Sequence, residues 1–217
     1  IYEAIGKPDM RTPDGFLNAL KAAKEKYPAV NNKPLIPIAF HEFTDKGCYS
    51  LENYIWNFLA IPLEKDGKLY DRYTDPEFIR WMKTFRKANE MGLVTKDIFL
   101  DIRAQMEEKV SEGRYFAMLY QNSDFQAQNQ TLYNKNPNSV YIAVDGFANS
   151  NMDAPKLLGG GISGWTLTLI SKNCKNPERA VKFFTYAISE EGNRDFFLGK
   201  EGVTWDNVNG KPTLKPE

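Results

Sequence analysis

Apolar residues recur at helical spacing in the last third of the chain. The stripe follows a proline, and its members are Ala180, Val181, Phe184, Ala187 and Ile188. Asn176 is a suitable N-cap, Pro177 suits a first turn in which its missing N–H would be unpaired, and Glu178 complements the helix dipole. Gly192 can supply a left-handed stop. The pattern therefore predicts an amphipathic helix that buries one face.

Other predicted helices carry similar boundary signals. Thr12-Pro13 and Asp75-Pro76 repeat the combination of a polar N-cap and a first-turn proline. The remaining boundary residues are Ser50, Gly92, Ser123 and, for a helix over residues 102–112, Gly113.

Short apolar runs between polar loops predict strands at residues 35–40, 115–120, 140–144 and 165–170. Pro37 in the first run favours an edge or the start of a strand, because proline cannot donate to a ladder. The segment EKDGK predicts a small hairpin. Strands that alternate with longer helices predict an α/β fold with a central mixed sheet flanked by helices.

The composition is that of a globular protein, with 42% hydrophobic and 26% charged residues among 217. The 28 basic and 28 acidic residues cancel. A chain without net charge has no general field to attract nucleic acid or an anionic membrane, so we expect a neutral or locally recognised partner. No apolar run approaches the ~20 residues of a membrane helix.

The ends and the cysteines add two expectations. The chain begins at Ile1 rather than at a methionine and shows no signal sequence, so we expect a piece of a longer protein. Cys48 and Cys174 are too few for a disulfide framework, and the sequence leaves open whether they pair. We interpret both as small buried hydrophobes.

Polar and aromatic residues gather in the loops beside three of the predicted strands. In α/β sheets, ligands bind beyond the carboxyl ends of strands. Aromatic rings and amides together suit a sugar, which has both an apolar ring face and hydroxyls. The candidate residues drawn from these loops are His41, Glu42, Phe43, Tyr49, Gln121, Asn122, Phe125 and the segment from Gly159 to Trp165.

Catalytic and nucleotide-binding readings fit the spacing poorly. Gly159, Gly161 and Gly164 match GxGxxG, but a strand rather than a helix is predicted after them, and Trp165 stands where a phosphate-binding loop needs lysine. The chain has a single histidine, and the HExxH pattern begun at His41 fails, so no metal site is expected.

A thiol hydrolase pair of His41 and Cys48 would lie within one local loop, with no third group to orient it. The acidic pairs Glu107-Glu108 and Glu190-Glu191 are explained by solvated helix faces. No catalytic residue and no cofactor are therefore predicted.

Several segments resemble, in order, the family 1 extracellular solute-binding proteins of ABC importers, the maltose-binding-protein-like group. The glycine-rich entry GGGISG is followed by SKNCKNPERAVKFF, SEEG and EGV, and EGRYFAML resembles the family's GK-AM strand. RTPDGFLNALKAAKEKYP resembles the family's P-TWDEF…A-K helix, although Gly15 replaces the usual acid.

The resemblance implies one lobe of a periplasmic-binding-protein type II fold. Residues 1–217 would form a single α/β lobe, the C-terminal one of two, with residues 193–217 as a hinge-side segment and Trp205 in a structural role. The first lobe would be absent, so half a site remains. By analogy its cleft wall comprises Trp165, Tyr120, Gln121, Asn122, Phe125, His41, Glu42, Phe43 and Gly161, with Trp165 beside Gln121.

The implied function is binding of a solute, an oligosaccharide first of all, for uptake through ABC importer permease subunits. The protein would be a monomer, extracellular as a cell-surface lipoprotein or periplasmic. The alternatives are a peptide-binding receptor of the same fold, a hydrolase or transferase domain that uses His41, and a structural interaction domain.

Overall fold

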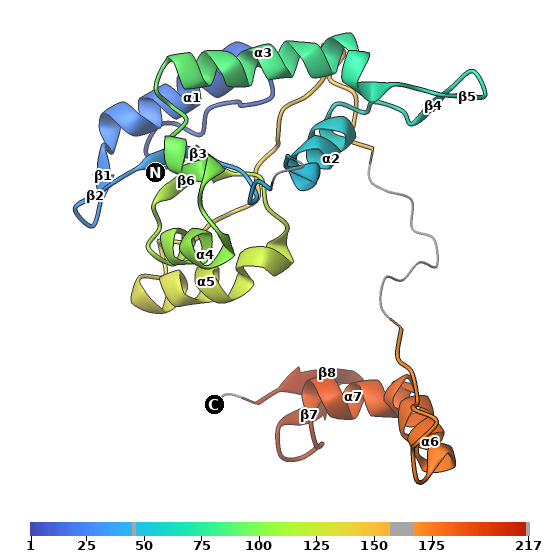
Figure 1. Ribbon diagram of the computed structural model, residues 1–217. Coiled ribbons are helices and arrows are strands. Elements are labelled where there is room, and N and C mark those ends of the chain that lie inside the picture. The colour runs from blue at the N-terminus through green and yellow to red at the C-terminus, as the bar shows by residue number, and fades with distance from the viewer. Residues whose placement is uncertain (45–46, 157–166, 216–217) are drawn as a thin grey trace. The chain divides into compact units, whose positions relative to one another are not determined.

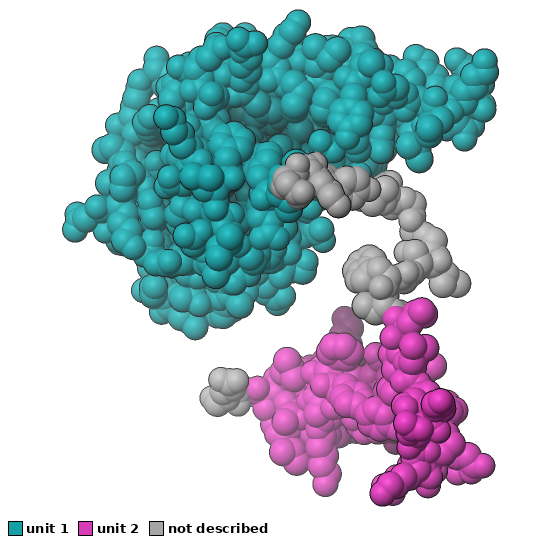
Figure 2. All heavy atoms as spheres, viewed as in Figure 1, with its two compact units in different colours: residues 1–159 teal, residues 160–217 magenta. Residues whose placement is uncertain are grey.

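The computed structural model describes residues 1–44, 47–156 and 167–215, apart from the side chains of Tyr49 and Asn122. The chain divides into two compact units (Figure 2): unit 1 comprises Ile1–Gly159 and unit 2 comprises Gly160–Glu217. Trp165 and Gly161, two of the predicted site residues, lie outside the described residues, and so does the expected proximity of Trp165 to Gln121. No helix among the described residues is long and apolar enough to cross a membrane.

Two parallel strands form the centre of unit 1. Strand β3 (Ile36–Ala39) pairs with β6 (Tyr115–Met118) in the register Ile36 with Tyr115 and Ile38 with Ala117. The Ile36 N–H donates to the Arg114 carbonyl (2.8 Å), so the imide nitrogen of Pro37, the next residue, faces away from β6. This geometry explains how a buried strand accommodates proline, and it confirms both predicted strands.

Helices cover the strand pair on both sides (Figure 1). Helices α1 (Pro13–Lys26) and α3 (Pro76–Glu90) lie on one side, and α4 (Arg103–Ser111) and α5 (Asn122–Lys135) lie on the other. The predicted caps are confirmed, since Thr12 Oγ1 accepts from the Gly15 N–H (3.1 Å) and Asp75 accepts from the Glu77 N–H (2.8 Å). A Cβ on Gly15 would lie 2.2 Å from the Asp9 carbonyl oxygen, which explains the glycine at that position.

Aromatic rings fill the core between α1, α3 and the strands. Trp81 is fully buried, its ring lies 4.8 Å from Phe147 and 5.7 Å from Phe16, and its Nε1 donates to the Ala148 carbonyl (3.0 Å). The polar end of the indole is therefore satisfied by the backbone of the segment that closes unit 1.

The other elements of unit 1 are short. Helix α2 (Tyr49–Phe58) precedes the hairpin of β4 (Glu64–Lys65) and β5 (Lys68–Leu69), which confirms the hairpin predicted at EKDGK. Strands β1 (Ala29–Val30) and β2 (Lys33–Pro34) form a second hairpin, and two 3₁₀ turns, η1 (Arg72–Thr74) and η2 (Lys96–Phe99), complete the set.

Three predictions for unit 1 were wrong in detail. Helix α2 begins after Cys48 and contains Ser50, and α5 begins after Gln121 and contains Ser123, so neither serine is an N-cap. Residues 140–144 form no strand. The side-chain amide of Asn129 bonds both the N–H (2.8 Å) and the carbonyl (3.2 Å) of Tyr141, and it thereby occupies the groups that a neighbouring strand would use.

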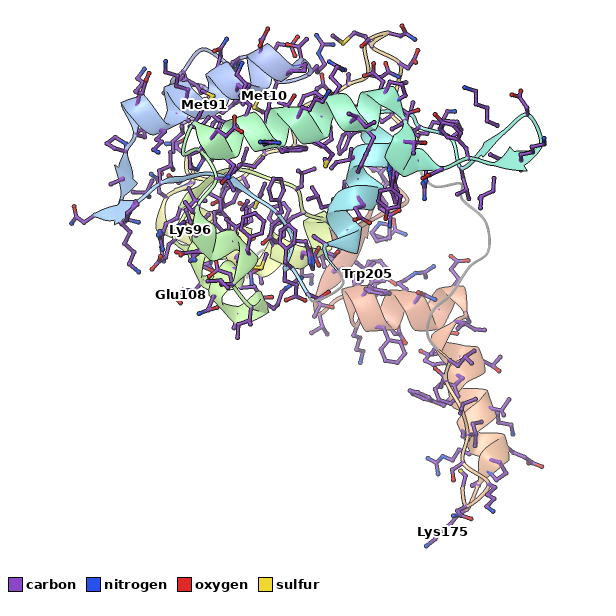
Figure 3. All side chains as sticks on the ribbon, turned by 45° about the horizontal axis from the view of Figure 1, so that its top comes forward. Met10, Met91, Lys96, Glu108, Lys175 and Trp205 are labelled. Carbon is purple, nitrogen blue, oxygen red and sulfur yellow. The ribbon has the colours of Figure 1, made fainter. Side chains whose placement is uncertain are left out.

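Unit 2 contains helices α6 (Pro177–Ala187) and α7 (Glu190–Leu198) and the antiparallel strands β7 (Trp205–Val208) and β8 (Lys211–Leu214). The Asn176 cap is confirmed by its bond from the Arg179 N–H (3.0 Å). Trp205 is buried, its Nε1 donates to the Gly199 carbonyl (3.0 Å), and its role within unit 2 is structural (Figure 3).

Other predictions for unit 2 were wrong. Helix α6 has no buried residue, and residues 167–170, the described part of the predicted fourth strand, form none. Gly192 does not end α6 but lies inside α7, where a Cβ would come 1.9 Å from the Tyr186 carbonyl oxygen. The glycine is needed because the end of α6 closely approaches the start of α7. Among the described residues, the strand ladders of the chain are all two-stranded, one parallel and the rest antiparallel. Because helices cover both sides of the parallel β3–β6 pair, the fold is α/β.

Candidate functional site

The residues after β3 and β6 meet at the carboxyl end of the parallel pair. His41 follows β3, and Tyr120 and Gln121 follow β6. The imidazole of His41 lies 5.6 Å from the Tyr120 ring, at an interplanar angle of 36°. Two loops that are 79 residues apart in the sequence, counted from His41 to Tyr120, are therefore neighbours, because parallel strands end at the same edge.

Arg103, the first residue of α4, is the centre of a polar cluster at this edge. Its Nη1 lies 2.9 Å from His41 Nε2, its Nη2 donates to Asp124 Oδ1 (3.0 Å), and its Nε donates to Glu107 Oε1 (2.7 Å). His41 Nε2 is also 3.6 Å from Asp124 Oδ2. These bonds hold the pKa of Arg103 above its ordinary value, because the two carboxylates favour the charged guanidinium.

The cluster determines which nitrogen of His41 carries the proton. A guanidinium has only donors, so the Nε2 that faces Arg103 must accept, and the proton of the neutral ring is on Nδ1. An Nε2 that is occupied in this way is not free to act as a general base. The Cys48 thiol donates to the His41 backbone carbonyl (3.4 Å) rather than to the ring, and burial raises its pKa. The structure therefore does not form the thiol–imidazole pair.

Two tyrosine hydroxyls lie buried near the cluster. Among the described residues, the buried hydroxyls of Tyr54 and Tyr120 make no hydrogen bond of standard geometry. Burial raises the pKa of Tyr120 well above its ordinary value, and it raises the pKa of Tyr54 too, although the nearby Gln121 side chain offsets part of the rise. Both phenols therefore stay protonated and can donate or accept.

The aromatic candidates have different surroundings. Phe43 packs against Phe99 (centroids 4.9 Å apart) and Phe40 (6.4 Å) at the same edge. Phe125 packs on Tyr141 (6.2 Å) against the small cluster around Val110, so its surroundings are those of a core residue. Glu42 is half-buried, and its charge contributes to the raised pKa of Cys48.

Sequence reasoning missed Arg103, Asp124 and Glu107. Glu107 was interpreted as part of a solvated face, but it accepts from Arg103, whereas its neighbour Glu108 is exposed. The signal available for Asp124 was its position three residues after Gln121, whose backbone N–H it accepts (3.3 Å). The pair of Arg103 with Glu107 is local, but the contacts with His41 and Asp124 that place Arg103 at the site come from elements distant in sequence.

The surface hollows of unit 1 lie elsewhere. One of ≈ 380 Å³ is lined by residues of η2, of α4 and of the segment between them, and there Lys109 forms ion pairs with Asp101 and Asp97. Another of ≈ 270 Å³ lies between Phe58 and residues 144–148 and 152–155. Neither is lined by His41, Tyr120 or Arg103. We take the cluster as the candidate site because charged, hydroxyl-bearing and aromatic side chains converge there.

Comparison with known proteins identifies the class. Residues 4–204 match the family described as bacterial extracellular solute-binding protein, and the chain belongs to this family. This confirms the family predicted from the motifs, a family of binding proteins rather than enzymes. No curated protein sequence matches the chain significantly.

Two solved structures are similar to the chain. The chain is similar to the alginate-binding protein AlgQ2, solved without calcium ion, with 23% sequence identity and a TM-score of 0.54 over 99% of this chain and 44% of that one. It also matches a sugar transporter from Bacillus licheniformis in complex with stachyose, with 20% identity and a TM-score of 0.46 over 88% of this chain and 48% of that one. The chain thus spans less than half the length of either protein, and the likeness to the first shows a periplasmic-binding-protein type of fold.

Proposed function

We propose that the chain supplies one wall of an interlobe cleft that binds a carbohydrate for uptake by an ABC importer. Family membership supports binding of an extracellular solute. The sugar class is supported by the site itself, because hydroxyl, amide and aromatic groups converge at the carboxyl end of the β3–β6 pair. The ligand wall would include His41, Glu42, Phe43, Tyr120, Gln121, Asn122, Phe125, Gly161 and Trp165.

The observation that carries the proposal is the unused hydrogen-bonding capacity at this edge. The buried Tyr120 hydroxyl has no hydrogen-bond partner among the described residues, and the neighbouring Gln121 side chain, which interacts with the Tyr54 hydroxyl, is exposed. Native proteins leave few buried polar groups unpaired, so each one needs an explanation. A hydroxyl-rich solute bound at the carboxyl end of β3 and β6 would explain these groups, because its hydroxyls would pair with them. The name of AlgQ2 states that it binds alginate, which also puts carbohydrates first among the ligands to test.

The proposed partners follow from the same reading. A solute-binding protein passes its ligand to importer permease subunits, and we propose a monomer that works outside the cytoplasmic membrane, as a lipoprotein or in the periplasm. Binding by closure of two lobes makes contacts on both sides of the ligand, so a single lobe should hold its solute weakly. Binding experiments therefore need the full-length parent protein.

The test is isothermal titration of the full-length protein with a panel of oligosaccharides, in wild type and in Gln121→Ala. Loss of a side-chain hydrogen bond to the ligand should weaken sugar binding by about tenfold. Gln130→Ala is the matched control, because Gln130 lies on α5, the helix that Gln121 precedes, is exposed and pairs with Asn134 (2.9 Å). No binding by any sugar would overturn the assignment, and binding of peptides instead would place the chain among peptide receptors.

A further inference from the structure

The loop after β3 lies against the segment that leads into α4. Two contacts join them: His41 Nε2 lies 2.9 Å from Arg103 Nη1, and the Phe43 ring lies 4.9 Å from the Phe99 ring at 53°. The first contact is polar and the second is aromatic. His41 and Phe43 are two residues apart, and Phe99 and Arg103 are four residues apart. An apolar surface therefore adjoins the polar cluster at the carboxyl end of the strands.

The aromatic contact is anchored in the core. From Phe99 the rings continue through Phe43 to Phe40 (6.4 Å), which is buried, and on to Phe85 (5.3 Å). Ile98 is also buried, at 4% exposure, and fixes the turn that presents the next side chain to solvent. Phe99 is 50% exposed. The ring of Phe99 is thus held on one side by Phe43 and the core, while half of its surface is open to solvent.

Two aliphatic residues close to Phe99 in the sequence are exposed as well. Leu100 and Ile102, which follow Phe99 along the same segment, are 78% and 65% exposed. Scattered apolar residues on a surface need no explanation, but apolar residues that adjoin one another beside polar groups mark interaction sites. The polar groups here are those around Arg103.

The charges of the cluster around Arg103 indicate which charge a ligand can carry. One guanidinium faces two carboxylates, Asp124 and Glu107, which leaves one negative charge. Four of the five N–H donors of Arg103 are engaged, because Nε bonds Glu107, Nη1 faces His41, and Nη2 donates to both Oδ1 and the backbone carbonyl of Asp124. The guanidinium therefore has no free pair of donors for the bidentate grip by which arginine recognises a carboxylate on a ligand. The cluster disfavours an anionic ligand.

We propose that Phe99, together with Phe43, forms an aromatic shelf on which an uncharged pyranose ring of the solute stacks. This inference rests on the proposed function and extends it, because it adds a ligand-contacting residue from η2 and restricts the class of sugar. The ring places its C–H face on the shelf, and its hydroxyls meet the polar groups beside Arg103. Sugar rings that carry carboxylates gain no partner there.

The experiment measures sugar affinity and thermal stability of the full-length protein in four forms: wild type, Phe99→Ala, Phe99→Tyr and Tyr133→Ala. Neutral oligosaccharides and uronate oligosaccharides of equal ring number are the ligands. Tyr133 is the matched control, since it is an aromatic residue of α5 with a similar exposure of 48%. We expect Phe99→Ala to weaken binding of the neutral sugar by about tenfold, Phe99→Tyr to restore it, and Tyr133→Ala to leave it unchanged.

Each contrary result has a distinct meaning. If Phe99→Ala leaves the affinity for the neutral sugar unchanged, with or without a lower melting temperature, Phe99 does not stack on the sugar, and the proposed function still stands. Tighter binding of the uronate sugar than of the neutral one overturns the charge assignment. Lys96, exposed in the same turn (Figure 3), is the cation that an anionic sugar would use, so Lys96→Ala should abolish such a preference. Absence of sugar binding in wild type removes the proposed function and this inference together.

Discussion

Helices α1 and α3 of unit 1 and helix α6 of unit 2 begin in the same way and pack differently. Each starts with a polar N-cap that accepts a backbone N–H, followed by proline. Helices α1 and α3 bury their apolar stripes, whereas α6 has no buried residue, although its stripe is as regular. The comparison teaches that a cap and a stripe specify a helix, while burial depends on what lies opposite.

The difference shows in single residues. Trp81 of α3 is 0% exposed and is surrounded by other rings, while Phe184 of α6 is 38% exposed. Val181 and Ile188 of the same stripe are exposed as well, at 52% and 81%. Helix α6 makes its contacts with α7, and its apolar stripe has no covering element among the described residues of unit 2.

The largest expected effect is a difference between the two units in the unfolding free energy that the loss of an aromatic ring costs. In this chain, Trp81→Ala should lower the free energy of unfolding by about 3–5 kcal/mol, because it removes a large buried ring and leaves a cavity. Phe184→Ala should lower it by less than about 1 kcal/mol, because that ring is partly exposed. Urea denaturation followed by circular dichroism measures both. A similar loss for the two variants would mean that the α6 stripe is covered in solution.

A smaller effect is expected from the helix caps. Thr12→Ala and Asn176→Ala each remove the side-chain acceptor at an N-cap, which costs about 1 kcal/mol. Hydrogen exchange should locate the two losses differently: Thr12→Ala lowers protection across the core elements that pack on α1, and Asn176→Ala lowers it in α6 alone. Reduced protection of unit 1 in the Asn176 variant would show that the units unfold together.

The smallest effect concerns the link between α6 and α7. The Tyr186 hydroxyl donates to Asp195, which raises the pKa of Tyr186 to about 12. Because the folded pKa lies above the unfolded value of about 10, the contact contributes fully below pH ~10, and its contribution is lost as the pH rises toward 12. An ultraviolet titration of phenolate formation should show this pKa, and Asp195→Asn should lower it. An unchanged titration in Asp195→Asn would contradict the link.

Much of the fold could be predicted from short-range patterns. The caps at Thr12, Asp75 and Asn176 lie where the sequence places them, because a polar side chain bonds an N–H only two or three residues away. The β3 and β6 runs were also correct, since apolar residues between polar loops have few alternatives. The run at residues 140–144 has the same pattern but forms no strand, because Asn129, more than ten residues away, takes the backbone groups of Tyr141.

The candidate site was predicted in part for a similar reason. His41, Tyr120 and Gln121 were found because they follow strands, and parallel strands bring their carboxyl ends together. Arg103 could not be found, because its contact with His41 spans 62 residues and its contact with Asp124 spans 21. Phe99, which we propose as a ligand contact, was not predicted either, because a half-exposed aromatic ring carries no signal until the ring beside it is known.

The sequence by itself determined most of the helices, the caps at Thr12, Asp75 and Asn176, the two central strands and the family, since each depends on residues close together or on ordered motifs. Tertiary structure alone decided which apolar stripes are buried, which run pairs as a strand, and which side chains surround His41. The physical reason is how far apart in the sequence the interacting groups lie. Caps and turns form within a few residues, whereas burial, strand pairing and ion pairs depend on groups that the chain brings together only when it folds.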